Sequence, residues 1–361
     1  MEPKRFEIGS EFTLDATHLT SQDDTFLHRL EAFQTVYYRS GRSAIRGVVR
    51  QIGGKRALLP GYICQSVIDA FEQENYFVSF YNINKDFSID IDDVNRKLDD
   101  SVDIFFLMHY FGKLQRDDDL RTIRNLCRNC SAAIVEDTTH SILTRTQTIG
   151  DYCVASLRKW FALPDGGVAY RGSGELDDAP QCNNRSFTNA RAAGMFLKGL
   201  YLDRLVDVNE IYRNLFAKAE EWMDEESEGG EISEFSKQLL AAFHVGNAAR
   251  RRNENAKYLA ENMNSRFVKP ALGTYNSVEC PIFFPLYVDN RDEFRSYLNR
   301  HHIYCPVHWP IEDKRLLEFA HVQHISERLI SIPIDQRYDL AAMEYICRII
   351  RQYDEDNREG I

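Results

Sequence analysis

The first half of the chain alternates short apolar runs with amphipathic segments, and no other feature limits the possible folds as strongly. Six runs are typical of strands: RALLP (56–60), YFVSFYNI (76–83), DIFFLMHYF (103–111), AAIVED (132–137), DYCVASL (151–157) and GVAYR (167–171). Helices are predicted between some of them, near 41–51, 62–75, 90–98 and 116–130. Because parallel strands need helical crossovers, we expect an α/β fold with a mainly parallel central sheet flanked by helices.

The second half changes character. From about 181 to 265 the pattern is helical, interrupted by the acidic run DEESEGGE, which we interpret as a solvated loop. A smaller α+β unit follows, with strands at 280–288 and 303–309 and helices at 291–302 and near 311–319, 324–330 and 339–353. The sequence therefore predicts a large domain over residues 1–240 and a small C-terminal domain over 241–361.

Composition excludes some classes of partner. With 361 residues and a formal net charge of -11, the chain is a poor match for nucleic acid or an anionic membrane. No stretch has the length and apolarity of a membrane helix, and the first residues do not form a signal peptide. Cys127 and Cys130 form a C-x-x-C without a second pair at zinc spacing, so we expect two helix-borne thiols and no metal site. The pattern of cysteines indicates a cytoplasmic protein.

Two polar side chains follow the apolar run AAIV. Asp137 and His140 come at the carboxyl end of a predicted strand, and parallel sheets bind ligands at that edge. The alternative is that these residues only cap the next turn.

A single lysine follows the next predicted strand, in ASLRKWFALPDGG. Lys159 lies between Leu157 and Trp160, and Ser156 precedes it by three residues. An apolar neighbourhood disfavours the ammonium form and so lowers the pKa of a lysine, which suits a nucleophilic amine. The alternative is a solvated surface charge, although the apolar flanks make full solvation less probable. The PDGG stretch predicts a turn that lets the backbone pass close to another group.

The segment RSGRSAIRGVV places Gly41 and Ser43 just before an apolar-periodic helix. Free N–H groups at a helix N-terminus bind phosphate well, although serine there can also be a simple cap. A lysine, an acid, phosphate donors and a contact for a phenolic oxygen are together what pyridoxal 5'-phosphate (PLP) requires.

These motifs resemble the DegT/StrS sugar aminotransferases, which have the aspartate-aminotransferase-like fold type I of PLP enzymes. The similarity runs from FEIGSEF through SGRSA, LPGYICQSVIDAF, FFLMHYFG and VEDTTHS to NRDEFRSYLNRHHI and ISIPID. The segment from Asp137 to Lys159 is its most specific part.

The resemblance implies a role for each matching residue. Lys159 would carry the cofactor as a Schiff base, Asp137 would keep the pyridine nitrogen protonated, and His140 would contact the phenolic oxygen. Phosphate ligands would be Ser156, Gly41, Arg42 and Ser43, with Arg42 as an additional cation in place of the usual threonine. Either Tyr62 or Cys64 would cover the ring, and the alternative for Tyr62 is a core residue.

The resemblance also implies a reaction and an assembly. The amino group would pass, from glutamate, to a keto-sugar carried on a nucleotide, as in polysaccharide biosynthesis. A homodimer with shared sites is implied, and three residues would reach the partner's site: Asn183, Asn184 and Arg185. His308 and Trp309, in CPVHWP, would have a modest role in substrate binding, the alternative being a packed tryptophan beside a surface histidine. A PLP-dependent sugar dehydratase and a PLP-binding regulator without turnover remain as alternative functions.

Overall fold

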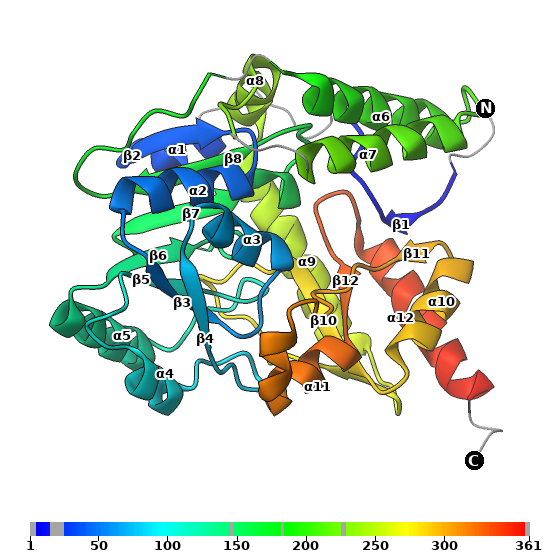
Figure 1. Cartoon of the computed structure of the whole chain (residues 1–361). Helices are drawn as coiled ribbons and strands as arrows, with labels where there is room; N and C mark the ends of the chain where they lie inside the picture. Colours follow the sequence, from blue (N-terminus) through cyan, green and yellow to red (C-terminus); the bar gives the residue numbers. More distant parts are fainter. Residues whose placement is uncertain (1–4, 15–24, 145–147, 182–183, 225–228, 358–361) are drawn as a thin grey trace. The chain divides into compact units, whose positions relative to one another are not determined.

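The computed structural model describes the chain except residues 1–4, 15–24, 145–147, 182–183, 225–228 and 358–361 (Figure 1). The described chain forms two compact units, and each is made of several stretches. The first unit contains residues 1–6, 11–52 and 152–246, and the second contains residues 7–10, 53–151 and 247–361. Because the units are interleaved along the chain, the division into 1–240 and 241–361 stays a prediction. Half of the acidic run, residues 225–228, lies outside the described residues.

The second unit contains the predicted parallel strands and their crossover helices. The strands lie side by side in the order β6-β5-β3-β4, and every pair among them is parallel. Their bounds are β3 (Arg56–Pro60), β4 (Phe77–Tyr81), β5 (Ile104–Met108) and β6 (Ala133–Asp137). The crossovers carry α3 (Gln65–Gln73), α4 (Ile91–Lys97) and α5 (Asp117–Cys130). The mainly parallel sheet and its flanking helices are thus confirmed, and the two thiols of the C-x-x-C lie on α5.

In the first unit the strands run antiparallel, in the order β2-β8-β7. Their bounds are β2 (Gln34–Tyr38), β7 (Tyr152–Ser156) and β8 (Gly167–Arg171). The sequence prediction missed β2, whose residues are mostly half-buried and do not form a long apolar run. The helices of this unit are α1 (Phe26–Leu30), α2 (Gly41–Ile52), α6 (Ser186–Leu202), α7 (Asn209–Asp224) and α8 (Glu234–Ala242).

The second unit also contains the smaller α+β part. Its antiparallel sheet has the order β12-β10-β9, with bounds β9 (Val268–Pro270), β10 (Phe283–Val288) and β12 (Leu329–Pro333). Around it lie α9 (Val245–Asn262, in this unit from residue 247), α10 (Arg291–Arg300), α11 (Ala320–Arg328) and α12 (Leu340–Asp356). A separate parallel pair joins β1 (Ile8–Gly9) to β11 (Ile303–Tyr304).

Three boundaries in this part differ from the prediction. The helix expected at 324–330 ends at Arg328, because the fully buried run LISIP forms β12. The helix expected near 311–319 is a 3-10 helix over Lys314–Glu318. The strand expected over 303–309 stops at Tyr304, and Pro306, which has no N–H for a strand ladder, follows closely.

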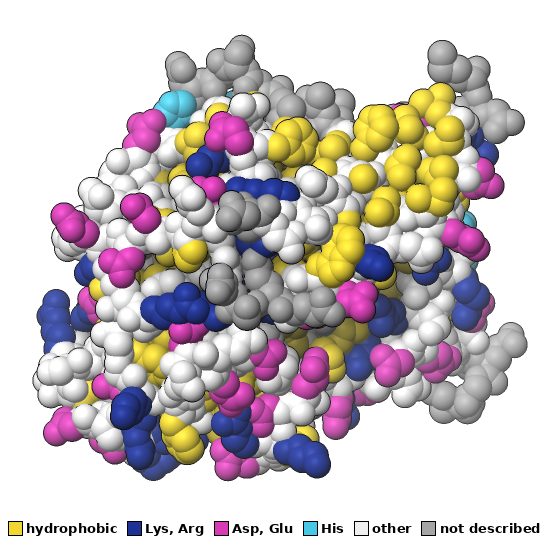
Figure 2. All heavy atoms as spheres, turned by 45° about the horizontal axis from the view of Figure 1, so that its top comes forward, with side chains coloured by type: hydrophobic (Ala, Val, Ile, Leu, Met, Phe, Trp, Pro, Cys, Tyr) yellow, Lys and Arg dark blue, Asp and Glu magenta, His cyan; other side chains and the backbone are white. Residues whose placement is uncertain are grey.

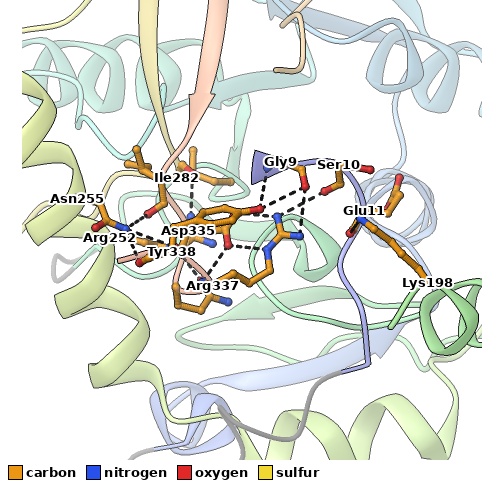
Figure 3. A network of polar contacts seen from close by, with 12 residues as sticks. Gly9, Ser10, Glu11, Lys198, Arg252, Asn255, Ile282, Asp335, Arg337 and Tyr338 are labelled. Carbon is orange, nitrogen blue, oxygen red and sulfur yellow. Dashed lines mark hydrogen bonds and ion pairs between the residues drawn. The ribbon is translucent and has the colours of Figure 1, made fainter. Parts of the chain in front are cut away.

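A network of polar contacts joins α9 to the segment that follows β12 (Figure 3). Arg337 donates from Nε to Asp335 Oδ1 (2.7 Å) and from Nη2 to Oδ2 (2.9 Å). On α9, Arg252 donates to the Ile282 carbonyl (2.8 Å), and Asn255 donates to the Tyr338 carbonyl (3.0 Å). The network therefore fixes the segment after β12 against α9. Among the described residues, no helix is both long and apolar enough to cross a membrane.

Asp335 supplies the negative charge of this network. Burial by itself would raise the pKa of Asp335, but the charge and hydrogen bonds of Arg337 hold it below its usual value. Asp335→Asn should lower the free energy of unfolding by about 3–5 kcal/mol at neutral pH, because it leaves buried guanidinium groups without their counterion. Chemical denaturation measures this difference.

Asp289→Asn is the matched control, because the Asp289 side chain is 93% exposed in its ion pair with Arg328. That change should cost less than about 1 kcal/mol. The effect at Asp335 should shrink below about pH 4, because the wild-type carboxylate loses its advantage as it is protonated. Equal effects of the two variants would show that the Asp335 network is not a stabilising one.

Candidate functional site

Lys159 follows β7 directly, as predicted. A 3-10 helix (Leu157–Lys159) continues the strand, and Leu157 and Trp160 are fully buried. The side chain of Lys159 is nevertheless exposed. The apolar flanks therefore do not bury Lys159, although Leu157 and Trp160 on either side of it belong to the core.

The start of α2 packs directly on the end of β7. A Cβ atom on Gly41 would lie 2.8 Å from Cβ of Ser156, so only glycine fits there. The predicted close approach at PDGG is also found, since a Cβ on Gly167 would lie 2.1 Å from the carbonyl oxygen of Ser40. Gly41 and Ser156, two predicted phosphate ligands, are thus brought into contact.

The first backbone N–H groups of α2 differ in what they bind. Ser40 caps the helix, because its Oγ accepts from the Ser43 N–H (3.0 Å) and lies 2.8 Å from Ser43 Oγ. Among the described residues, the N–H groups of Gly41 and Arg42 have no acceptor. The Arg42 guanidinium pairs with Asp224 (2.9 Å) at the end of α7. The N–H groups of Gly41 and Arg42 are therefore the donors that this helix start offers to an anion.

A charged cluster beside Lys159 was not foreseen. Glu220 on α7 accepts from Arg158 (3.0 Å) and pairs with Arg191 on α6, which also binds Glu11 (2.5 Å). Burial would raise the pKa of Glu220, but the two guanidinium groups, helped by the charge of Lys159, lower it to about 2. No local pattern could reveal the cluster, because its members come from distant parts of the sequence.

In the second unit, Asp137 is the last residue of β6 and is only 5% exposed. Burial raises the pKa of its carboxyl group, while hydrogen bonds from Thr139 and the nearby His109 act in the opposite direction. The Thr139 N–H donates to Asp137 Oδ1 (2.8 Å), which fixes the turn after the strand. The leading causes of this shift include no lysine or arginine. A cationic N–H of a ligand would suit this carboxylate.

His140 is buried three residues further on. Its Nδ1 accepts the backbone N–H of Phe111 (3.2 Å). A nitrogen that accepts carries no hydrogen, so the imidazole is neutral and its hydrogen is on Nε2. His140 therefore presents a hydrogen-bond donor, as a contact to a phenolic oxygen requires.

A buried pair behind Asp137 was also missed. His109, one residue beyond β5, lies with Nε2 3.1 Å from Oε1 of Glu136, while the N–H of Gln115 donates to its Nδ1 (3.1 Å). The other oxygen of Glu136 accepts from the N–H groups of Ile149 (2.7 Å) and Gly150 (2.8 Å). A glutamate inside a buried strand was the available signal, since such a charge needs a partner.

The two candidates for covering the cofactor ring have different surroundings. Tyr62 is 1% exposed and lies among the rings of Phe87, Tyr110 and Trp309. Cys64 is half-buried at the N-terminus of α3. Tyr62 thus has the packing of a core residue.

The predicted substrate residues of the C-terminal part lie against His140. Trp309 stacks on the His140 ring, with centroids 5.5 Å apart and an angle of 22° between planes. His308 packs edge-on to the same ring (5.7 Å, 85°) and is 4% exposed, so it is not a surface histidine.

The residues expected to reach a partner's site are at the start of α6. Arg185 donates to the backbone (3.0 Å) and carboxylate (3.2 Å) of Glu231 within its own unit. The exposed Asn184 accepts from the Ser186 N–H (2.9 Å). Asn183 lies outside the described residues.

The fold of this chain is found in solved structures of aminotransferases. Three solved structures share it: DesV from S. venezuelae, in complex with a ketimine intermediate; PseC from Helicobacter pylori, an aminotransferase involved in pseudoaminic acid biosynthesis; and Spr1654 from Streptococcus pneumoniae, assigned as a sugar aminotransferase and solved in its PLP form. No family model matches the chain, and no curated protein matches it in sequence.

The likeness covers nearly the whole length of each chain at low identity. DesV is 17% identical, over 91% of this chain and 87% of its own, with a TM-score of 0.64. PseC is 13% identical, over 97% and 100%, with a TM-score of 0.66. Spr1654 is 13% identical, over 98% and 99%, with a TM-score of 0.66. At these identities the likeness shows the fold.

The buried carboxylate of Asp137 should reduce the stability of the cofactor-free protein. Because burial raises the pKa of Asp137, the folded state disfavours the ionised form, and Asp137→Asn should raise the free energy of unfolding at neutral pH. The gain should vanish as the pH falls through the folded-state pKa, where wild-type Asp137 is protonated. Urea titrations over a pH series measure it.

Asp165→Asn is the contrasting control. Asp165 is equally buried, but its oxygens accept from Thr188 Oγ1 (3.1 Å), Ser233 N (2.9 Å) and Ser233 Oγ (2.6 Å). An amide would place its own hydrogens against these donors, so this change should cost roughly 1–3 kcal/mol. A comparable loss at Asp137 would identify that residue as structural.

Proposed function

We propose that this protein is a PLP-dependent aminotransferase. The observation that carries the proposal is Asp137, a buried carboxylate at the end of a parallel strand, in a chain with the fold of sugar aminotransferases. The proposal assigns Lys159, Asp137 and His140, together with the start of α2, to one cofactor, as the resemblance implies.

PLP supplies an aldehyde that condenses with amines and a ring that withdraws electrons from the bonds next to that nitrogen. Asp137 would hold a proton on the pyridine nitrogen, because a neighbouring carboxylate favours the charged form. His140 would donate from Nε2 to the phenolic oxygen. The N–H groups of Gly41 and Arg42 would bind the phosphate, with Ser156 beside them and Ser43 held by its bond to Ser40.

Lys159 would hold the cofactor through its Nζ atom. Once an amino donor has replaced it, the freed amine would take a proton from the donor's Cα and return it to the cofactor's carbon. Exposure is compatible with both tasks, since the amine must reach an incoming ligand. The ion-pair partners of the neighbouring Glu220 are Arg158 and Arg191.

The substrates belong to the same proposal. We expect glutamate as the amino donor and a keto-sugar carried on a nucleotide as the acceptor, with Arg185, His308 and Trp309 as candidate substrate ligands. The sugar class follows from the resemblance and from the neighbours with this fold. We also expect a cytoplasmic location, with which the cysteine usage of the sequence agrees.

Lys159 gives the decisive experiment. Borohydride reduction of cofactor-loaded protein should fix the cofactor to one peptide, which mass spectrometry identifies as the one containing Lys159. Lys159→Ala should abolish this adduct and reduce amino transfer by several orders of magnitude, on the order expected for loss of a covalent catalyst. Lys159→Arg should fail too, because a guanidinium stays protonated.

Lys257→Ala is the matched control, because Lys257 is 75% exposed on α9 and should leave adduct and activity intact. An adduct on another peptide, or none in loaded protein, would refute the assignment. An adduct with a sugar product that has lost water, without amino transfer, would indicate a dehydratase. A coloured protein that glutamate does not bleach would indicate a regulator.

We further propose that the protein is a homodimer. Large apolar side chains gather over α6 and α7 of the first unit (Figure 2), where Phe196 (56%), Leu205 (68%), Val206 (40%) and Ile211 (53%) are exposed. Clustered exposure of this kind is typical of association surfaces. Phe196→Asp should shift the mass measured by sedimentation toward the monomer. Phe77→Asp, on β4 and 65% exposed, should not, and an unchanged mass for Phe196→Asp would remove α6 from the interface.

A further inference from the structure

The ring of His140 is held on several sides within the second unit. Its Nδ1 accepts from the N–H of Phe111, a residue with a positive φ of 55° just beyond the end of β5. That hydrogen bond sets the tautomer. It does not by itself set the plane of the ring, because an imidazole can tilt about a single bond.

The plane is set by the segment that follows β11. The indole of Trp309 covers one face of the imidazole in a stacked arrangement, and His308 meets it edge-on. His308 is itself fixed, because its Nδ1 lies 2.8 Å from Oγ of Ser331 on β12. His140 is 1% exposed, and the ring of Phe111 packs on it as well (5.1 Å, 41°), so the imidazole is confined by Phe111, Trp309 and His308 together.

We propose that Trp309 and His308 are positioning residues for His140, and that they tune the cofactor through it. The sequence analysis expects a role toward substrate for these two residues, whereas in the structure both rings pack on His140. By keeping the Nε2–H direction constant, they would keep the hydrogen bond to the phenolic oxygen short and straight. This inference rests on the proposed function, because it needs a PLP molecule whose phenolic oxygen faces His140.

Simple core packing is the competing explanation. Trp309 also lies 5.3 Å from the ring of Tyr62, and His308 lies 4.9 Å from the ring of Phe283. Packing alone would make Trp309 important for stability but would leave the electronic state of a bound cofactor unchanged. The experiment must therefore read that state.

The first measurement is the pH titration of the visible absorption of bound PLP, without substrate. His140→Ala should shift the midpoint, and Trp309→Leu should shift it in the same direction by about half a pH unit, the size expected for one lost ring contact. Trp309→Phe keeps a flat ring and should restore most of the wild-type midpoint. In the double variant with His140→Ala, Trp309→Leu should add nothing further, because both act through one group.

The ionisable groups around His140 are Asp137, which begins its loop, and His308, which packs on its edge. His308→Asn therefore belongs in the series, with an expected shift smaller than that of His140→Ala. Trp222→Leu is the control, because Trp222 packs on a separate cluster between α6 and α7. It should leave the midpoint unchanged.

The second measurement needs no cofactor. In the histidine nitrogen NMR spectrum of the cofactor-free protein, the signals lost in His140→Ala identify that ring, and they should report the Nε2–H tautomer. Trp309→Leu should broaden them, because the ring gains freedom, and Trp309→Phe should sharpen them again. Unchanged His140 signals in Trp309→Leu, or a midpoint that moves in His140→Ala but in neither His308→Asn nor Trp309→Leu, would overturn the inference.

The two proposals fail in different ways. If the NMR signals respond as expected but no cofactor binds through Lys159, the ring is positioned as inferred and the proposed function is wrong. If Lys159 carries the cofactor and only His140→Ala alters its titration, the proposed function stands and Trp309 is a packing residue.

Discussion

The parallel pairing of β5 with β6 is the constraint on which the second unit depends. Its register sets Met108 opposite Asp137, so the residues after both strands emerge at one edge of the sheet. His109 then meets Glu136, and Phe111 meets His140. A shift of the register by one residue would exchange the faces of the sheet on which Glu136 and Asp137 lie, because side chains alternate along a strand. The buried Glu136, bound by three donors, therefore stabilises the register on which Asp137 depends.

The sequence predicted those features that depend on local order. The parallel strands have apolar cores and turns at regular spacing, so β3 to β8 and α2 to α5 fall close to their expected places. Asp137 and His140 were recognised because they directly follow a strand. Tyr62 could not be assigned from sequence, because burial among three other rings is a property of tertiary packing.

The features that were missed depend on distant partners or on direction. Lys159 is exposed although Leu157 and Trp160 are fully buried, and a pattern of residue types does not give this difference. The cluster of Arg158, Arg191 and Glu220 joins three elements that no periodicity connects. The strand β12 was hidden because its short apolar run continues the amphipathic pattern of α11, and it pairs with β10 across more than one intervening element.

The interleaving of the two units has a consequence for the order in which the chain folds during its synthesis. All described stretches of the first unit have been made once residue 246 leaves the ribosome, whereas the second unit still lacks α10, α12 and β12. β10 cannot pair with β12 until residue 333 has been made. The Gly9 N–H likewise has no Tyr338 hydroxyl to bind until residue 338 has been made. The nascent chain thus exposes the four parallel strands and a partial core for the time needed to add more than a hundred residues, and this interval is when chaperone contact would matter most.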